Sequence, residues 1–341
     1  MNNNPQISSL GETKLITLIE DLVLKKTGKA LVRDDSFFFN FREKNLSGDL
    51  VLNSDMLVSS TDVPPQMSNY QIGKKSVVMN VSDLLVKGVK PKGIVVSLGL
   101  PRDFERDNFI QVIQGIIDCS MIYNLEYIGG DINETNELII NPTVFGFKKP
   151  SDIIHRKGMS KGDIIMVNKK FGLTGVGFDI LLNQQWNSED VQKYKRSITS
   201  VLEPDVSGKE ALILAELKLA TSSIDSSDGL SKTLLDLQSS NPNLGFEIDF
   251  DDDLIDLEAK NYSREFSISL ENLVFNGGEE FIHLFTINPN DISTVEKIVQ
   301  AKNGNLFSIG KVITGDQIFF IKENKRIEVK SEGFEHFIER S

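Results

Sequence analysis

The sequence contains little cysteine and little histidine. Its one cysteine, Cys119, excludes an internal disulfide and any metal cluster held by cysteines. Cys119 lies among the apolar positions of a predicted helix, so we expect it to be a buried thiol. Only three histidines are present. A metal site in this protein should therefore be built from oxygen ligands, which select hard ions such as Mg²⁺.

Long apolar runs and an excess of positive charge are also missing. No run approaches the roughly 20 apolar residues of a membrane helix. The start MNNNPQISSLGE lacks the basic-then-apolar pattern of a signal peptide, so we expect a soluble, cytoplasmic protein with no membrane partner. The chain has 49 acidic and 37 basic residues and a net charge of −12, which argues against a nucleic-acid surface. Phosphate ligands would need divalent cations to bind such a chain.

The common nucleotide-binding signatures are absent as well. The sequence has no GxxxxGK[ST] P-loop and lacks the HRD and DFG motifs of protein kinases. Residues 172–178, GLTGVGF, are rich in glycine but match neither the P-loop nor GxGxxG. We interpret them as a packing turn between a strand and a helix, with anion binding at the start of that helix as the alternative.

Length and patterning predict two α+β domains. The 341 residues can form two hydrophobic cores, and KKPSD near residue 150 separates two patterned halves, 1–150 and 151–341. Strands and helices alternate irregularly, which favours α+β over a doubly wound parallel sheet. The predicted helices cover residues 12–26, 77–91, 104–123, 207–219, 230–238 and 291–301. The predicted strands cover residues 36–41, 49–57, 93–100, 126–128, 138–147, 163–167, 245–250, 281–287, 307–309 and 318–321.

Three local interpretations accompany these elements. The strand that begins at residue 126 should break at Gly129, Gly130 and Asp131, because paired glycines are typical of a turn. Pro142 suggests that its strand lies at a sheet edge or contains a bulge. Residues 222–230, SSIDSSDGL, should form a turn that leads into the next helix.

The helix predicted over residues 77–91 contains a lone carboxylate in a mostly apolar setting. Its valines and leucines recur at steps of three and four, whereas Asn80, Asp83 and Lys87 fall on a different face. A buried carboxylate needs a partner, because its desolvation is costly. Asp83 should therefore meet a Lys or Arg side chain or a metal ion, unless it is an ordinary surface aspartate.

Further aspartates lie where a predicted strand ends or a helix begins. They are Asp34, Asp35, Asp55, Asp131, Asp225 and Asp228. Each has a structural explanation of its own, such as helix capping by Asp228. If they converge on one cleft, two unit charges about 4 Å apart would repel by roughly 4 kcal/mol at an effective dielectric constant near 20. A domain is stable by only about 5 to 15 kcal/mol, so a convergent cluster would require cations, Mg²⁺ first, and carboxylate-held Mg²⁺ usually serves substrate phosphates.

A series of short motifs points to a known family. They are GETKLI at Gly11, RDDSF at Arg33, NSDMLV at Asn53, NVSDLLVKGVKP at Asn80, IGGD at Ile128, HRKGMSKGD at His155, SSIDSSDGL at Ser222 and NGGEEF at Asn276. In this order they resemble the thiamine-monophosphate kinases, a family of the aminoimidazole-ribonucleotide-synthetase-like superfamily, over nearly the whole chain. The resemblance implies two α+β domains and a homodimer in which N-terminal strands close a barrel.

The resemblance also implies a reaction. These enzymes transfer the γ-phosphoryl group of ATP to thiamine monophosphate, giving thiamine diphosphate and ADP, directly and with Mg²⁺. ATP would be the co-substrate and thiamine monophosphate the second small-molecule partner. No catalytic base is expected, because the acceptor is a phosphate that is already ionised near neutral pH.

Individual residues receive roles from the same motifs. The Mg²⁺ ligands would be Asp35, Asn53, Ser54, Asp55, Asp83, Asp131, Asp225 and Asp228. The contacts to ATP would come from Gly130, Asp131, Arg156 and Ser227. Glu279 and Phe334 would contact the thiamine end. Asp62 stands in STDVPP where many family members carry a substrate-binding histidine, and it is the candidate contact at that position.

Two alternatives remain open from the sequence. The nearest related enzyme is aminoimidazole ribonucleotide synthetase, over which SSIDSSDGL and GGEEF favour the kinase. The other is a paralogue that binds nucleotide or Mg²⁺ without catalysis. The complete set of acidic residues counts against that second alternative.

Overall fold

The chain folds into two compact units. A computed structural model describes residues 6–31, 48–182 and 188–329. The first unit comprises residues 1–84 and 89–150, and the second comprises residues 85–88 and 151–341. Asp34, Asp35, Phe334 and the strand predicted over residues 36–41 lie outside the described residues.

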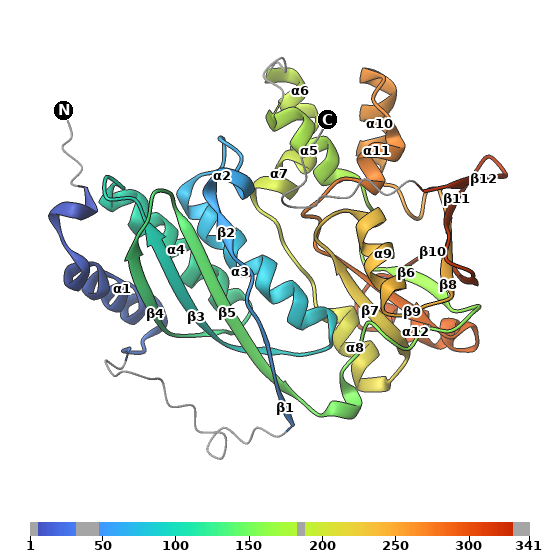
Figure 1. The fold of residues 1–341 in the computed structure, drawn as a ribbon, viewed down its shortest axis with the longest axis horizontal. Coiled ribbons are helices and arrows are strands. Elements are labelled where there is room, and N and C mark those ends of the chain that lie inside the picture. The colour runs from blue at the N-terminus through green and yellow to red at the C-terminus, as the bar shows by residue number, and fades with distance from the viewer. Residues whose placement is uncertain (1–5, 32–47, 183–187, 330–341) are drawn as a thin grey trace. The chain divides into compact units, whose positions relative to one another are not determined.

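The first unit contains a mixed sheet in the order β1-β5-β3-β4, with β2 also paired to β5 (Figure 1). Only the β3–β4 pair is parallel. Helices α3 and α4 lie along one side of the sheet, behind the strands in Figure 1. The elements are α1 Glu12–Thr27, β1 Asp49–Asn53, β2 Leu57–Val58, α2 Ser59–Asp62, α3 Asn69–Val86, β3 Pro91–Leu100, α4 Arg106–Ile122, β4 Glu126–Glu134 and β5 Ile139–Lys148, with a short 3-10 helix at Ile7–Ser9.

The second unit contains a sheet in the order β12-β11-β8-β10-β6-β9-β7. Its strands are antiparallel except for β8 and β11. The strands are β6 Ile164–Val167, β7 Ala220–Ser226, β8 Leu244–Asp249, β9 Ile282–Ile287, β10 Phe307–Thr314, β11 Ile318–Lys322 and β12 Lys325–Glu328. The helices are α5 Leu173–Leu182, α6 Ser188–Lys193, α7 Lys195–Leu202, α8 Lys209–Leu217, α9 Leu230–Ser239, α10 Leu257–Phe266, α11 Leu270–Phe275 and α12 Ile292–Ala301, with 3-10 turns at Pro150–Asp152 and Pro289–Asp291.

Helices cover both faces of this second sheet. Strand β9 shows the consequence, since every one of its residues is buried. Ile282 and Leu284 enter one core together with α5, α9, α10 and α11. Phe285 and Ile287 enter a second core together with α8 and α12. A strand buried on both faces has a nearly continuous apolar sequence, and FIHLFTI, predicted as a strand over residues 281–287, has such a sequence.

The α+β class is confirmed, and the long elements form where the patterns predict them. The helix at 12–26, the helix at 104–123 and the strand at 93–100 agree with α1, α4 and β3 within three residues at each end. Cys119 is buried, and burial raises the pKa of its thiol to about 12. Among the described residues, none of the helices combines the length and the hydrophobicity that a membrane crossing requires.

The central helix differs from its prediction at both ends. Helix α3 begins at Asn69, so the polar segment before Val77 is helical too. It ends at Val86, where Gly88 adopts a left-handed φ of 73° and Val89 N donates to Leu84 O at 3.1 Å. This closing bond is the usual glycine stop of a helix. The residues that follow, from Pro91 onward, belong to β3 rather than to the helix.

The strand predicted to break at Gly129 continues instead. Strand β4 runs through to Glu134, and its pairing with β3 shifts register near Gly129, whose φ is 147°. A Cβ on Gly130 would lie 1.8 Å from Val96 O, so only glycine allows β3 to approach so closely. The two glycines therefore form a bulge within a strand and do not end it.

Two other local interpretations were wrong in part. Residues 222–226 of SSIDSSDGL form strand β7, and only Ser227–Gly229 make the turn. Pro142 lies in β5, which is an interior strand rather than an edge. However, β1 pairs only with residues 144–148 of β5 and β2 only with residues 139–140. Pro142 therefore sits in a local gap, where its missing N–H breaks no ladder on that side.

Close contact between α3 and α4 depends on two glycines. A Cβ on Gly115 would lie 2.1 Å from Tyr70 O, and a Cβ on Gly73 would lie 2.2 Å from Val112 O. We predict that Gly115→Ala lowers the free energy of unfolding by about 1 to 3 kcal/mol, because the added methyl overpacks the helix contact. In an unconstrained helix the same change would stabilise by about 1 kcal/mol. Urea denaturation, with Gln111→Ala on the exposed side of α4 as the control, gives the sign, and an unchanged or raised midpoint would contradict the packing argument.

Candidate active site

A polar turn between β1 and β2 brings together four of the predicted site residues. Asn53 ends β1, and its Nδ2 donates to Asp83 Oδ2 on α3 at 2.9 Å. Asp55 N donates to Asn80 Oδ1 at 2.8 Å, and Asn80 Nδ2 donates back to Asp55 O at 3.0 Å. Asn80 is completely buried. Asn80 and Asp83, three residues apart on α3, thus hold an irregular segment that lies outside the hydrogen-bond ladders of β1 and β2.

Strand β5 holds the same turn from its other side. Ser54 Oγ lies 3.1 Å from both Asn141 Oδ1 and Pro142 O, and 2.9 Å from Thr143 Oγ1. These three β5 residues are the ones left unpaired by β1 and β2. The gap in the sheet is therefore filled by a side chain, and the sequence at the turn is polar because its backbone groups need partners.

Asp131 of β4 lies in line across the sheet with Asn141 of β5, the residue that contacts Ser54 of the turn. It is opposite Ser97 of β3, which is in turn opposite Asn141 of β5. Residues in register point to the same face, and strands are about 4.8 Å apart, so Asp131 and Asn141 have Cα atoms about 10 Å apart. Asp131 is exposed. The first unit thus places Asn53, Ser54, Asp55, Asp83 and Asp131 in one region, which the sequence could only propose.

The oxygen atoms of this turn suit Mg²⁺. Asn53 Oδ1 is buried and has no hydrogen-bond partner within the described part of the chain. A buried acceptor without a donor costs about 1 to 3 kcal/mol, and a bound cation would satisfy it. Amide, hydroxyl and carboxylate oxygens are the ligands of a hard ion. Over the same residues, no three His, Cys, Asp or Glu side chains gather at one point, so the predicted metal ligands stay a prediction.

Asp62 has a structural partner. Its Oδ2 accepts from Val58 N at 2.7 Å, which closes the short helix α2, Ser59–Asp62. Its carbonyl oxygen accepts from Lys75 Nζ at 2.5 Å, and Lys75 is only 1% exposed. Asp62 therefore caps a turn through one carboxylate oxygen. Its predicted contact with the substrate remains untested.

The second unit gathers the predicted residues of SSIDSSDGL and NGGEEF. Asp225, only 7% exposed, lies near the end of β7 in register with His283 of β9. Glu279 N donates to Ser227 O at 2.5 Å, and Phe281 N donates to Ser226 O at 2.9 Å. The two motifs are more than 40 residues apart in the printed sequence, yet these bonds place them side by side.

Asp228 does not cap the helix that follows it. The N-cap position of α9 is Gly229, which has no side chain to offer. Burial raises the pKa of Asp228, and the negative charges of Asp236 and Asp225 act in the same direction, whereas Lys232 opposes them. The structural explanation considered for Asp228 is therefore wrong. A half-buried carboxylate with two acidic neighbours is a position where a cation would lower the free energy.

Glu280 is a residue that sequence reasoning missed. Its Oε1 accepts from Gly172 N at 2.7 Å and from Thr174 N at 3.3 Å, at the first turn of α5. At the start of the helix in GLTGVGF, the backbone N–H groups thus bind a carboxyl oxygen of the same unit, and the alternative of anion binding there stays a prediction. The signal was two adjacent acidic residues directly before a strand that is buried on both faces, because one of the pair must then point inward.

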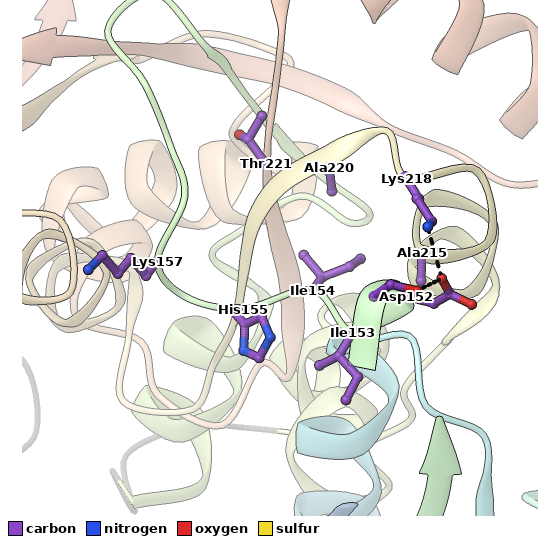
Figure 2. A pocket seen from close by; sticks show the side chains of 10 residues that line it. Asp152, Ile153, Ile154, His155, Lys157, Ala215, Lys218, Ala220 and Thr221 are labelled. Carbon is purple, nitrogen blue, oxygen red and sulfur yellow. Dashed lines mark hydrogen bonds and ion pairs between the residues drawn. The ribbon is translucent and has the colours of Figure 1, made fainter. Parts of the chain in front are cut away.

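Arg156 lies in the segment between the 3-10 turn at Pro150–Asp152 and β6. It is exposed, and its carbonyl oxygen accepts from Asn241 Nδ2 at 2.8 Å. A small cavity of about 120 Å³ lies beside this segment, lined among others by His155, Lys157 and Thr221, with Lys218 Nζ 3.3 Å from Asp152 Oδ1 (Figure 2). None of the sequence-predicted site residues lines this cavity.

The buried carboxyl of Glu280 predicts a pH-dependent stability. Burial raises its pKa from 4.5 to about 8, and the negative charge of Asp256 adds to this, whereas the amides of Gly172 and Thr174 oppose it. Because the pKa is higher in the folded state, the protonated carboxyl stabilises that state. This contribution is complete below about pH 4.5 and is lost as the pH rises through about 8. Between pH 5 and pH 8 the free energy of unfolding should fall more in the unchanged protein than in Glu280→Gln. Parallel pH profiles from urea denaturation would contradict this.

Comparison with known proteins places the chain in a family. The model of the AIR synthase related protein, N-terminal domain, matches residues 33–147. Thiamine-monophosphate kinase of Nitrosopumilus maritimus is 32% identical over 332 residues, which cover 97% of this chain and 100% of that protein. The enzyme of the same name from Methanocaldococcus jannaschii is 29% identical over 90% of this chain and 95% of that protein.

Solved structures share the fold. Thiamine-monophosphate kinase from Stenotrophomonas maltophilia has a TM-score of 0.75 at 22% identity, over 90% of this chain and 95% of that one. The structure described as AaThiL complexed with AMPPCP and TMP has a TM-score of 0.73 at 24% identity, over 98% and 99%. Hydrogenase maturation protein HypE of E. coli has a TM-score of 0.74 at 15% identity, over 93% and 97%. The fold is thus common to proteins of different names, and only the sequence similarity over nearly the whole chain distinguishes between them. On that similarity, the protein belongs to the thiamine-monophosphate kinase family and is a kinase.

Proposed function

We propose that this protein transfers the γ-phosphoryl group of ATP to thiamine monophosphate, with Mg²⁺, giving thiamine diphosphate and ADP. The structural observation that carries the proposal is the turn at Asn53–Asp55, which is held by Asn80 and in which Asn53 Oδ1 is buried with no donor among the described residues. The choice of thiamine monophosphate rests on the relatives of that name and on the similar structure that holds AMPPCP and TMP.

Each unit carries residues with a proposed role. Mg²⁺ would be held by Asn53, Ser54, Asp55, Asp83 and Asp131 of the first unit and by Asp225 and Asp228 of the second, together with Asp35. Bound Mg²⁺ supplies neutralisation and orientation of the phosphate groups. Gly130, Asp131, Arg156 and Ser227 would contact ATP, and Asp62, Glu279 and Phe334 would contact thiamine monophosphate.

The side chains mainly position the reactants. Arg156 is an exposed cation in an acidic protein and suits a phosphate oxygen. Glu279 is half-buried next to Ser227, and its carboxylate suits a ring that carries a fixed positive charge. The acceptor is a phosphate whose second pKa is near 6, so it is largely ionised at neutral pH and needs no general base. The proposed transfer is therefore direct and in line, without a phospho-enzyme.

A homodimer formed through the N-terminal strands is part of the proposal. Among the described residues, strand β1 is the edge of its sheet and leaves Leu50 51% and Leu52 59% exposed. Two large exposed apolar side chains on such a strand favour association with another strand. Light scattering of the protein in solution, compared with Leu52→Asp, tests this part alone.

The first experiment measures turnover. Purified protein is incubated with ATP, Mg²⁺ and thiamine monophosphate, and thiamine diphosphate is followed by chromatography with and without a chelator. Metal-dependent product is expected. Binding of ATP without any product would refute the proposed reaction and would favour a related synthetase or a non-catalytic paralogue.

Removal of a single predicted ligand should abolish most turnover without unfolding the protein. We predict that Asp83→Asn lowers kcat by about a hundredfold or more, the scale at which one electrostatic partner of a transition state acts. The introduced amide oxygen can still accept from Asn53 Nδ2, so the turn should stay in place. Asp103→Asn, on an exposed loop of the same unit, is the control. Near-normal turnover of Asp83→Asn at saturating Mg²⁺ would remove Asp83 from the site.

Phe334 allows the two substrates to be separated. Because it is predicted to contact only the thiamine end, Phe334→Ala should raise the KM for thiamine monophosphate by about tenfold or more, the loss expected for a buried aromatic contact, and leave the KM for ATP within about twofold. Initial rates with each substrate varied in turn provide the comparison. An equal rise in both constants would show that Phe334 acts on the fold or on both substrates.

A further inference from the structure

The two adjacent glutamates of NGGEEF have different surroundings. Glu279 is half-buried, and its backbone N–H bonds to Ser227 O of the SSIDSSDG turn. Glu280 is 8% exposed, and its Oε1 accepts two backbone N–H groups at the start of α5. The two carboxyl groups thus lie in different surroundings, that of Glu279 partly exposed and that of Glu280 in the protein interior.

The backbone through these residues is in an unfavourable conformation. Glu279 has a φ of 61° and Phe281 a φ of 47°, both in the left-handed region that residues with a side chain seldom adopt. Such a segment persists only when its surroundings impose it. The bonds from Glu279 N to Ser227 O and from Phe281 N to Ser226 O hold the two ends. Between them, the only anchoring side chain with a described bond is Glu280.

Helix α5 supplies a rigid support for that anchor. The first N–H groups of a helix have no partner within the helix, and Glu280 Oε1 accepts from two N–H groups there, those of Gly172 and Thr174. Thr174 is 2% exposed, so these bonds are sheltered from water. A Cβ on Gly277 would lie 2.7 Å from Leu273 O, so the loop is also closely packed just before the glutamates.

We propose that Glu280 is a positioning residue that holds the Glu279 carboxylate where a positively charged substrate ring binds. The inference rests on the proposed function, because it takes thiamine monophosphate as the ligand of Glu279. The bonds from the Gly172 and Thr174 N–H groups to Glu280 Oε1 tie the loop to α5, and they offset the left-handed backbone at Glu279 and Phe281. Without them the loop relaxes, and the loss falls on the substrate that Glu279 contacts. Ser227, the proposed ATP contact that is bonded to Glu279 N, keeps its place because it directly follows Ser226, which is in register with Ile282 of β9.

The test compares Glu280 with a matched buried glutamate. Glu210 on α8 is 4% exposed, and its Oε1 accepts from Asn305 N at 3.1 Å, so it also ties a loop to a helix in the second unit. The purified full chain is prepared as Glu280→Ala, Glu280→Gln and Glu210→Ala. Thermal unfolding, KM for each substrate and the Kd for thiamine monophosphate from calorimetry are measured for all three.

Glu280→Ala should raise both the KM and the Kd for thiamine monophosphate at least tenfold, with the KM for ATP within twofold of the unchanged protein. Glu280→Gln should restore both to within about threefold, because an amide oxygen still accepts from Gly172 and Thr174. Glu210→Ala should lower the unfolding temperature while leaving the KM for thiamine monophosphate unchanged. If Glu280→Ala does not fold, Glu280→Asp, whose shorter side chain withdraws the carboxylate from the amides, should show the same separation of the two substrates.

Two results would overturn the inference, and they are distinguishable. If the unchanged protein neither binds nor phosphorylates thiamine monophosphate, the proposed function fails and the role of Glu280 toward that ligand fails with it. If the unchanged protein is active but Glu280→Ala alters both KM values equally, or no more than Glu210→Ala does, the proposed function stands and Glu280 is only a structural residue.

Discussion

The buried amide of Asn80 is the interaction on which the polar turn of the first unit depends. It accepts from Asp55 N and donates to Asp55 O, so one side chain provides what a neighbouring strand would otherwise provide. The turn that Asn80 holds separates β1 from β2, and it places Ser54 against the part of β5 that pairs with neither of these strands. Because Asn80 is fully buried, loss of this pairing would leave backbone groups and an amide without partners inside the protein.

In the second unit, the side-chain carboxyl group of Glu280 holds an irregular segment in a similar way. The loop at residues 276–281 has no ladder of its own, and Glu280 ties it to the free N–H groups of α5. In both units an irregular segment that carries predicted site residues is fixed by a buried polar side chain, which lies on α3 in the first unit and within the loop itself in the second. This is the general requirement that buried backbone groups be satisfied, met here by side chains where regular pairing stops.

Fold and reaction are set by different parts of the protein. HypE shares this fold at a TM-score of 0.74 with 15% identity, so the arrangement of helices and strands does not choose the chemistry. Under the proposed function the turns would choose it, since they carry aspartates that a folded chain of net charge −12 tolerates only at some cost. Burial raises the pKa of Asp228, and the negative charges of its acidic neighbours Asp236 and Asp225 act in the same direction. Phosphoryl transfer with Mg²⁺ suits such a site, because the cations offset the acidic charge and the phosphates alike.

Periodicity and motif order were enough to predict the α+β class, the long elements such as α1, α4 and β3, and the family. These properties depend on local pattern, which a sequence displays directly. Local pattern could not reveal that Gly129 forms a bulge inside β4, because that depends on how closely β3 approaches. It could not separate Glu279 from Glu280, since the two are identical in type and adjacent, and only the position of α5 decides which one is buried. Nor could it show that Asn80 supports Asp55, because that pairing joins residues 25 positions apart and is determined by packing. The start of α9 at Gly229 rather than Asp228 likewise depends on the backbone conformation at that turn, which residue type alone does not fix.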